Sequence, residues 1–149
     1  MRSHRSGFTL LELTIALSIA LVLVGLAAPR LRRARERAIL SNTHDYLVSS
    51  LATGRAAAIQ RGRRVDVVIT GGLIKLADGT SSAVIGQPVR LDSTQVSISA
   101  TSGTISFDSR GFATGLPMAG ATYVLTRGDR VDSVCVTRLG MIMERGCGS

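Results

Sequence analysis

The sequence predicts an α+β protein in which a long N-terminal helix, membrane-spanning in its first half, packs on a small, mostly antiparallel C-terminal β domain. Three observations predict this fold. An apolar run extends from Phe8 to Ala28, apolar residues recur at helical spacing from Leu40 to Ala58, and from Arg64 onward the period of the pattern changes to two. With 149 residues, the chain has room for one β domain of modest size after the membrane segment is subtracted.

The apolar run from Phe8 to Ala28 is the first element of the chain. Its length is close to the roughly 20 residues that cross the hydrocarbon core as a helix. Its only ionisable side chain is Glu12, and a carboxylate well inside such a helix costs about 2.5–3.5 kcal/mol on insertion scales. The start of the run lies near the cytoplasm if the short leader with Arg2 and Arg5 stays inside, an orientation that the arginines after Pro29 oppose by the positive-inside rule and that the leader or the export machinery must impose. Glu12 therefore needs a partner or a function, and it is the first functional candidate.

Three interpretations of this stretch compete. An ordinary secretory signal has an apolar region of only about 7–15 residues, and the one candidate cleavage site here, Leu26-Ala27-Ala28, is followed by Pro29. A plain membrane anchor explains the length of the run but not the carboxylate of Glu12. The third interpretation depends on a resemblance that begins one residue before the run.

The residues Gly7-Phe8-Thr9-Leu10-Leu11-Glu12-Leu13 closely resemble the processing motif of type IV prepilins and of the pseudopilins of type II secretion. The resemblance implies that prepilin peptidase cuts between Gly7 and Phe8 and that Phe8 becomes N-methylated. It also implies that Glu12 pairs with the α-amino group of a neighbouring subunit during assembly, and that Pro29 marks a helix kink. A carboxylate that is unsatisfied in lipid gains a cationic partner when helices pack side by side, so the physical argument agrees.

The resemblance also implies a domain organisation and a location. We expect a leader peptide at 1–7, a transmembrane and assembly helix at 8–28, the exported half of the long helix at 29–62 and a β-rich globular domain at 63–149. The chain would be a single-pass protein of the bacterial inner membrane with its C-terminal domain in the periplasm, and would then join a pilus or pseudopilus. The implied partners are prepilin peptidase, other pilin or pseudopilin subunits and the inner membrane.

The exported half of the helix carries a basic block and then an apolar stripe. The arginines from Arg30 to Arg37 either contact lipid headgroups and solvent or contribute to a DNA contact. Gly62 is expected to end the helix, because glycine tolerates the left-handed conformation that closes helices. The residues of the stripe, which we expect to pack on a sheet, are Leu40, Leu47, Leu51, Gly54 and Ala58.

The segment 63–149 has the pattern of a β domain. Val65, Val67 and Ile69 alternate with other residues, and Gly71-Gly72 then turns the chain into Leu73–Leu76, which predicts a hairpin. Further strands are predicted at 96–100, 105–107, 123–126, 131–137 and 141–143. Turns are predicted at Asp78-Gly79, Gly86-Gln87-Pro88 and Arg127-Gly128-Asp129, and flexible loops at Thr80–Gln87 and Thr114–Gly120.

Cys135 and Cys147 lie near the C-terminus, on the exported side of the predicted topology. In an oxidising periplasm they would pair as a disulfide, which by the loop-entropy estimate contributes about 2–3 kcal/mol. Two thiols are too few for a structural zinc site, and no histidine cluster completes one. We therefore expect a disulfide and no metal.

A second, weaker resemblance covers the last third of the chain. Phe107 to Gly115 and Val134 to Ile142 resemble segments of GspH and FimT-type pseudopilins. Independently of that resemblance, we expect Phe107 and Phe112 to be core residues on either side of a turn. Some FimT-type minor pilins are thought to bind DNA through arginines near the C-terminus. In this chain Met141 follows Gly140, where family members commonly carry arginine, so a DNA contact would depend on Arg138 and Arg145.

Composition supports a structural subunit more than an enzyme. The formal net charge is +8, and the basic residues are arginines except for Lys75, as codon bias or a phosphate-binding surface would produce. After processing, His44 is the only histidine, and no phosphate-binding loop, dinucleotide fingerprint or zinc-protease motif is present. We predict no cofactor and no catalysis. The predicted function is that of a minor pilin or pseudopilin in a type II secretion system or type IV pilus. The alternative is a minor pilin that acts in DNA uptake by binding double-stranded DNA.

Overall fold

The computed structural model describes residues 9–91, 95–144 and 147. The chain divides into two compact units, 1–37 and 38–149. One helix, α1 (Leu10–Arg61), begins in the first unit and ends in the second. The later elements in the described part of the chain are the strands β1 (Val65–Thr70), β2 (Leu73–Asp78), β3 (Val84–Arg90), β4 (Ser97–Ala100), β5 (Thr104–Phe107), β6 (Ala113–Thr114), β7 (Ala121–Arg127), β8 (Arg130–Val136) and β9 (Ile142–Met143).

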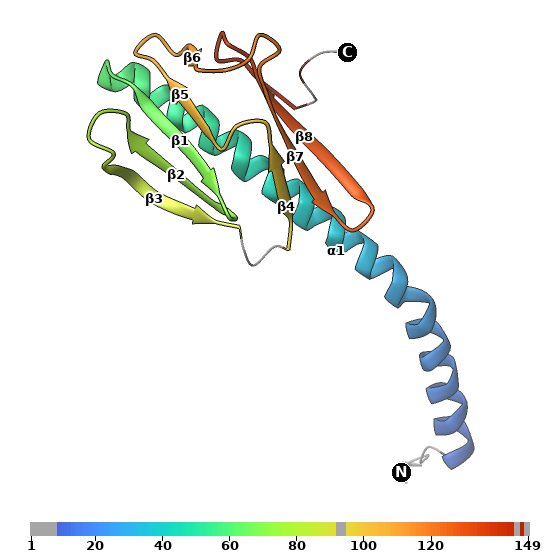
Figure 1. The fold of residues 1–149 in the computed structure, drawn as a ribbon. Helices are drawn as coiled ribbons and strands as arrows, with labels where there is room; N and C mark the ends of the chain where they lie inside the picture. The colour runs from blue at the N-terminus through green and yellow to red at the C-terminus, as the bar shows by residue number, and fades with distance from the viewer. Residues whose placement is uncertain (1–8, 92–94, 145–146, 148–149) are drawn as a thin grey trace. The chain divides into compact units, whose positions relative to one another are not determined.

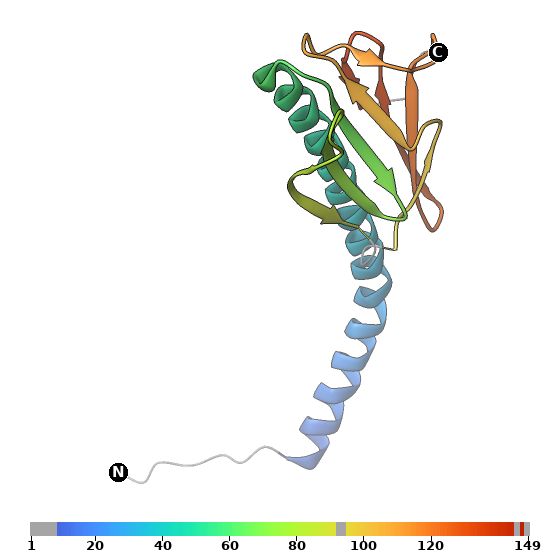
Figure 2. The same ribbon diagram turned by 60° about the vertical axis from the view of Figure 1, so that its left-hand side comes forward.

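In the second unit, the strands lie along one side of the last part of α1, as Figures 1 and 2 both show. The helix contacts them through the stripe predicted from the sequence: Leu47, Leu51 and Ala58 are fully buried, and Leu40 is 7% exposed. Gly54 is buried between them and lies against Val67 of β1, where there is no room for a larger residue. The predicted stripe is therefore confirmed as the face of α1 that enters the core.

The C-terminus of α1 has the hydrogen bonds of a Schellman motif. The amide of Gly62 donates to the carbonyl of Ile59, and the amide of Arg63 donates to the carbonyl of Ala58. Gly62 has φ +62°, the left-handed conformation that this motif requires and that glycine adopts without a Cβ penalty. The predicted helix end is confirmed, and the motif directs the chain into β1.

The strands form two antiparallel sheets. The first has the order β3-β2-β1-β5-β6, and the second has the order β4-β7-β8-β9. The predicted hairpin of β1 and β2 is present, with Thr70 opposite Leu73. β4 and β5 are consecutive in the chain but belong to different sheets, so the connection between them joins the two sheets. Both sheets and α1 contribute to one core, in which Phe107 and Tyr123 are the largest fully buried side chains.

The predicted turn at Gly86-Gln87-Pro88 is wrong, and so is the predicted loop from Val84 onward. These residues belong to β3, where Ile85 pairs with Leu76 and Val89 pairs with Ile74. Three residues of β3 thus lie opposite Lys75 alone, which is a β-bulge, and Gly86 supplies its positive φ of 74°. Pro88 is tolerated because β3 is an edge strand and needs hydrogen bonds on one side only.

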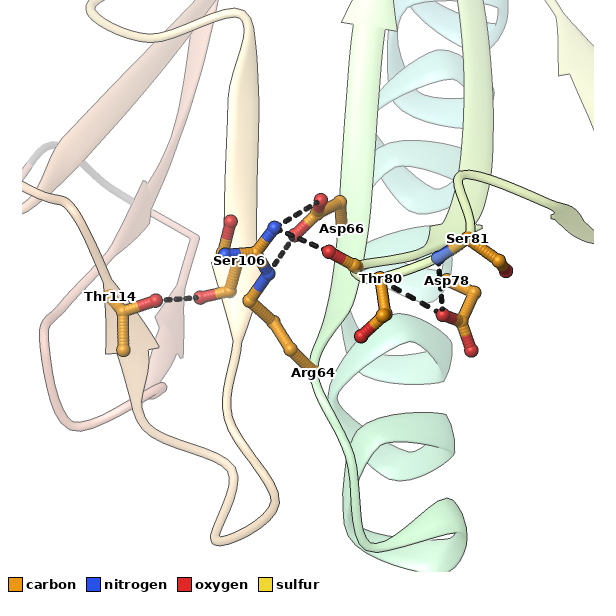
Figure 3. Close-up of polar contacts among 8 residues, drawn as sticks. Arg64, Asp66, Asp78, Thr80, Ser81, Ser106 and Thr114 are labelled. Carbon is orange, nitrogen blue, oxygen red and sulfur yellow. Dashed lines mark hydrogen bonds and ion pairs between the residues drawn. The ribbon is translucent and has the colours of Figure 1, made fainter.

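Polar contacts fix the loop that joins β2 to β3 and the start of β1 (Figure 3). The amides of Ser81 and Thr80 each donate to Oδ1 of Asp78 at a distance of 3.0 Å, and Nη1 of Arg63 lies 3.2 Å from Asp78 Oδ2. Arg64 pairs with Asp66 at 3.3 Å and also donates to the carbonyl of Gly79 at 2.6 Å. The predicted turn at Asp78-Gly79 is therefore held by its own aspartate and by the two arginines that lie between Gly62 and β1.

Gly54→Ala should destabilise the chain. An added Cβ would meet Cγ2 of Val67, and overpacking of this kind costs about 1–3 kcal/mol. The gain of about 1 kcal/mol in helix propensity offsets only part of that cost. We expect a net loss of up to about 2 kcal/mol in the free energy of unfolding, measured by urea denaturation of the purified chain in detergent.

The control for this variant is Thr53→Ala on the exposed side of the same turn, which should change stability by less than about 0.5 kcal/mol. A Gly54→Ala variant that is more stable than the wild type by about 1 kcal/mol, as helix propensity alone predicts, would contradict the packing assigned to this glycine.

Asp78 should make stability depend on pH. Hydrogen bonds from the amides of Ser81 and Thr80, with a smaller contribution from Arg63, lower the pKa of this carboxyl below its usual value of 3.8. Because the pKa of this carboxyl is lower in the folded chain than in the unfolded chain, its ionised form stabilises the fold fully above the unfolded-state pKa. This stabilisation is lost as the pH falls through the folded-state pKa. The difference in stability between wild type and Asp78→Asn should therefore stay constant near neutral pH and shrink below about pH 4. Urea denaturation of the purified chain in detergent across a pH series measures this difference.

Candidate functional site

The first half of α1 presents an apolar surface with no protein packed on it. The large apolar side chains from Leu10 to Val24 are each between 53% and 81% exposed. Among the described residues, α1 is the one helix that is long and apolar enough to cross a membrane, judged by length and composition. Apolar side chains in such a continuous surface require lipid or other helices as their environment.

The start of α1 is capped by Thr9. The amide of Glu12 donates to Oγ1 of Thr9 at 3.2 Å, and the amide of Leu13 donates to the Thr9 carbonyl at 3.1 Å. Glu12 is thus the third residue of the helix, at the spacing of a capping box and near the positive end of the helix dipole. This cap is a feature that the sequence analysis missed, although Thr9-x-x-Glu12 is its signature. Gly7 and Phe8, the two residues of the predicted cleavage site, lie outside the described residues.

The other polar side chains of the apolar segment are satisfied within the helix. Oγ1 of Thr14 donates to the carbonyl of Leu11 at 2.8 Å, and Oγ of Ser18 donates to the carbonyl of Thr14 at 2.7 Å. The Glu12 carboxylate has no such intramolecular partner among the described residues. It is therefore the group of this segment whose desolvation has to be compensated from outside the monomer.

Beyond the apolar segment, α1 continues through Pro29 into the basic block, Arg30 to Arg37, whose arginines are exposed. The kink at Pro29 stays a prediction, because helix is assigned on both sides of this residue without a break. The basic block belongs to the first unit.

The two segments of the second unit that carry the second resemblance each contain a loop. Each loop is closed by hydrogen bonds among its own residues. In the loop from Asp108 to Phe112, Oδ1 of Asp108 accepts hydrogen bonds from the amides of Arg110 and Phe112, each at a distance of 2.9 Å. In the loop from Thr137 to Met141, the amide of Thr137 donates to the carbonyl of Met141 and the amide of Gly140 donates to the carbonyl of Thr137, each over 2.9 Å. We call these two segments the distal loops.

The distal loops contact each other and α1. The amide of Ala113 donates to the carbonyl of Arg138 at 3.0 Å, and Nε of Arg55 donates to the carbonyl of Gly111 at 3.1 Å. Gly140 lies so close to the Gly111 carbonyl that a Cβ at this position would collide with it. The sequence analysis did not predict this junction of Arg55, Gly111 and Gly140. The available signal was the presence of a glycine in each of the two segments that carry the second resemblance.

The predictions for the two phenylalanines and for the arginines near the C-terminus differ in how well they agree with the structure. Phe107 is fully buried, as predicted, but Phe112 is 41% exposed, so its assignment to the core is wrong. Phe112 comes directly after the left-handed Gly111, and its amide is held by Asp108, so it remains in the loop rather than in a strand that faces the core. Arg138 and Met141 are exposed. Arg145, the other arginine of the predicted DNA contact, lies outside the described residues.

The disulfide between Cys135 and Cys147 is present. Cys135 is fully buried in β8, opposite Met143 of β9, and the bridge secures the chain beyond β9 to this strand. Gly120, which has φ +86°, approaches both Cys147 and the carbonyl of Val136, so the bridge is packed against the start of β7. The predicted pairing of the two cysteines is confirmed.

The titratable groups of the second unit were predicted to form no metal site. No three His, Cys, Asp or Glu side chains come together in the described residues as a metal site. His44 is 8% exposed on α1, with Nδ1 3.5 Å from Asp45. Burial raises the pKa of the Tyr123 phenol well above its usual value, so this side chain stays neutral in the core.

A helix with an exposed apolar first half, followed by a second half packed on antiparallel sheets, is the pilin fold. The structure is similar to the type IV minor pilin FimU of Pseudomonas aeruginosa (13% identity, TM-score 0.63, 76% of this chain and 93% of FimU). It is also similar to the minor pseudopilin EpsH from the type 2 secretion system of Vibrio cholerae (13% identity, TM-score 0.56, 73% of this chain and 98% of EpsH). At these identities the likeness concerns the fold.

The sequence identifies the family. Residues 2–28 match the prokaryotic N-terminal methylation motif, and residues 44–140 match the family described as type II transport protein GspH. The chain belongs to this GspH family and is a pilin-like subunit of the minor pilin or pseudopilin kind. No curated protein matches the chain by sequence.

Cys147→Ser should lower stability without changing the fold of the described core. The bridge joins residues 12 apart in sequence, and closing a loop of this size contributes about 2–3 kcal/mol. We expect a loss of that size in urea denaturation of the purified chain in detergent, and an equal loss when the wild type is reduced. A wild type that loses no stability on reduction would show that the bridge does not contribute.

Proposed function

We propose that this chain is a minor pilin or pseudopilin that prepilin peptidase cleaves between Gly7 and Phe8, that is N-methylated at Phe8, and that assembles through its N-terminal helix. The observation that carries the proposal is the exposed apolar half of α1, in which Glu12 has no intramolecular partner among the described residues. The methylation motif over residues 2–28 supports the processing step.

Before assembly, the first half of α1 would span the bacterial inner membrane once, with the basic leader in the cytoplasm and the β domain in the periplasm. The paired cysteines support an oxidising location for the β domain. During assembly, the apolar helix would leave lipid for a bundle of similar helices. Glu12 would dock beside the α-amino group of a neighbouring subunit, so that two groups that are costly in an apolar environment neutralise each other.

The role we propose is structural rather than catalytic. The matched family and the two similar structures are a transport protein, a minor pilin and a minor pseudopilin.

Glu12→Gln should leave leader cleavage intact and reduce incorporation into filaments by about tenfold or more, the effect of losing roughly 1.4 kcal/mol of docking free energy. Glutamine has nearly the same shape and still satisfies a capping box, so a loss of assembly would identify the charge, and not the helix cap, as the essential property. Incorporation is measured as the ratio of sheared-filament to membrane-bound chain on an immunoblot.

Two control variants accompany this measurement. Thr14→Ala removes a hydroxyl that is already satisfied within the helix, so it should assemble normally. Gly7→Leu should block cleavage, so that only the uncut precursor is found in the membrane. Normal assembly of the Glu12→Gln variant would remove the Glu12 charge from the mechanism.

A second candidate function is the binding of double-stranded DNA during uptake. Its support is the exposure of Arg110 and Arg138 on the distal loops, together with the net charge of +8. The exposed Met141, which occupies the position after Gly140 where arginine is common in the family, weakens that support.

We expect duplex DNA to be retarded by the purified chain in detergent only at low salt. A few arginine–phosphate contacts lose affinity steeply as salt rises, because binding releases condensed counterions. Gel retardation across a salt series measures this. Retardation that persists at physiological salt, and that is lost when Arg138 and Arg145 are both replaced by alanine, would favour the DNA-binding function instead.

A further inference from the structure

The distal loops and the turn of α1 that they contact gather exposed apolar side chains. Ile59 is 48% exposed, Phe112 41%, Leu139 59% and Met141 52%. Ile59 lies against Gly111, and the two loops are joined through the Gly111–Gly140 contact, so the four residues belong to one locality. Figure 1 shows the same arrangement, with the β5–β6 connection and the end of α1 at the same end of the second unit. We call these four residues the distal patch.

The edge of the distal patch is positively charged. Arg110 and Arg138 are exposed members of the two loops, and neither forms an ion pair within the described residues. The carboxylate of the same loops is Asp108, and its Oδ1 is occupied by the amides of Arg110 and Phe112. The two guanidinium groups are therefore available to a partner.

The position of this surface is fixed by the fold. Arg55 ties the Gly111 carbonyl to α1, and Gly111 and Gly140 are in contact through their backbones. Surfaces that are held rigid before binding lose less conformational entropy when a partner docks. A rigid apolar centre with a charged edge is the usual anatomy of a protein interface.

The chemistry of the patch favours one kind of occupant. The backbone of duplex DNA offers phosphates to arginine but no apolar surface for Leu139 and Met141. A second copy of this chain would place arginine against arginine, and like charges in contact oppose association. A protein that presents an apolar area edged by carboxylates satisfies both the apolar and the basic parts of the patch.

We infer that the distal patch, with Arg110 and Arg138 at its edge, is the docking surface for another subunit of the same filament, one that presents an acidic, partly apolar surface. The inference rests on the proposed function, since the partner it names is a filament subunit. It assigns Arg138 to a protein contact instead of a DNA contact.

The test places a photoreactive amino acid at position 139 of the full chain, in cells that build the filament. Irradiation should crosslink the photoreactive residue to a different filament subunit. Mass spectrometry should identify the crosslinked peptide of that subunit as one with exposed Asp or Glu residues. The matched control is position 131, where Val131 is 65% exposed in the β7–β8 hairpin, and it should give no adduct with that peptide.

Charge reversal tests the basic edge of the patch. Arg110→Glu combined with Arg138→Glu should reduce the adduct from position 139 by about tenfold, because opposed charges become like charges. Arg130→Glu, in the same hairpin as the control position, should leave the adduct yield unchanged.

Several outcomes would overturn the inference. These are filaments that contain the chain but give no adduct from position 139, an adduct with a second copy of the chain, and a nuclease-sensitive adduct with DNA. Absence of the chain from filaments is a different result, because it would overturn the proposed function itself.

Discussion

The central physical constraint of the structure lies in the first half of α1, where the chain itself does not cover an apolar surface. The side chains from Leu10 to Val24 are mostly exposed, and Glu12 stands among them without an intramolecular partner within the described residues. The hydrocarbon core of a bilayer can cover apolar side chains, but it offers a carboxylate no counter-charge. Under the proposed function, the helix leaves lipid for a bundle of neighbouring helices, where a cationic group of another subunit can pair with Glu12.

The second half of the same helix obeys the opposite rule, since its apolar stripe is covered by the chain's own sheets. Leu47, Leu51 and Ala58 are fully buried, and Gly54 allows β1 to approach closely. Because both sheets and α1 contribute to one core, the loops at the far end of the second unit are held against α1 through Arg55. One continuous helix thus has an exposed apolar surface in one unit and a buried apolar stripe in the other.

Periodicity and local chemistry were enough to predict much of the fold from the sequence. The buried stripe, the end of α1 at Gly62, the first hairpin and the disulfide each depend on spacing or on one residue's chemical or conformational preference. The errors arose where tertiary context changed the meaning of a local signal. Gly86 and Pro88 are typical of a turn but form a bulge in an edge strand, and Phe112 stays out of the core because Asp108 closes its loop, a contact that periodicity does not encode. The junction of Gly111 and Gly140 joins two separate segments of the chain, so no local pattern could reveal it.

The most direct test of the central claim, that the first half of α1 is a processed assembly helix, is mass spectrometry of the N-terminal peptide from chain recovered in sheared filaments. The account predicts a peptide that begins at Phe8 and carries one added methyl group on its α-amino nitrogen. A peptide that begins at Met1, or one that begins after Ala28, would contradict it. The first would mean that the leader is retained, and the second that the apolar helix is a signal that is removed.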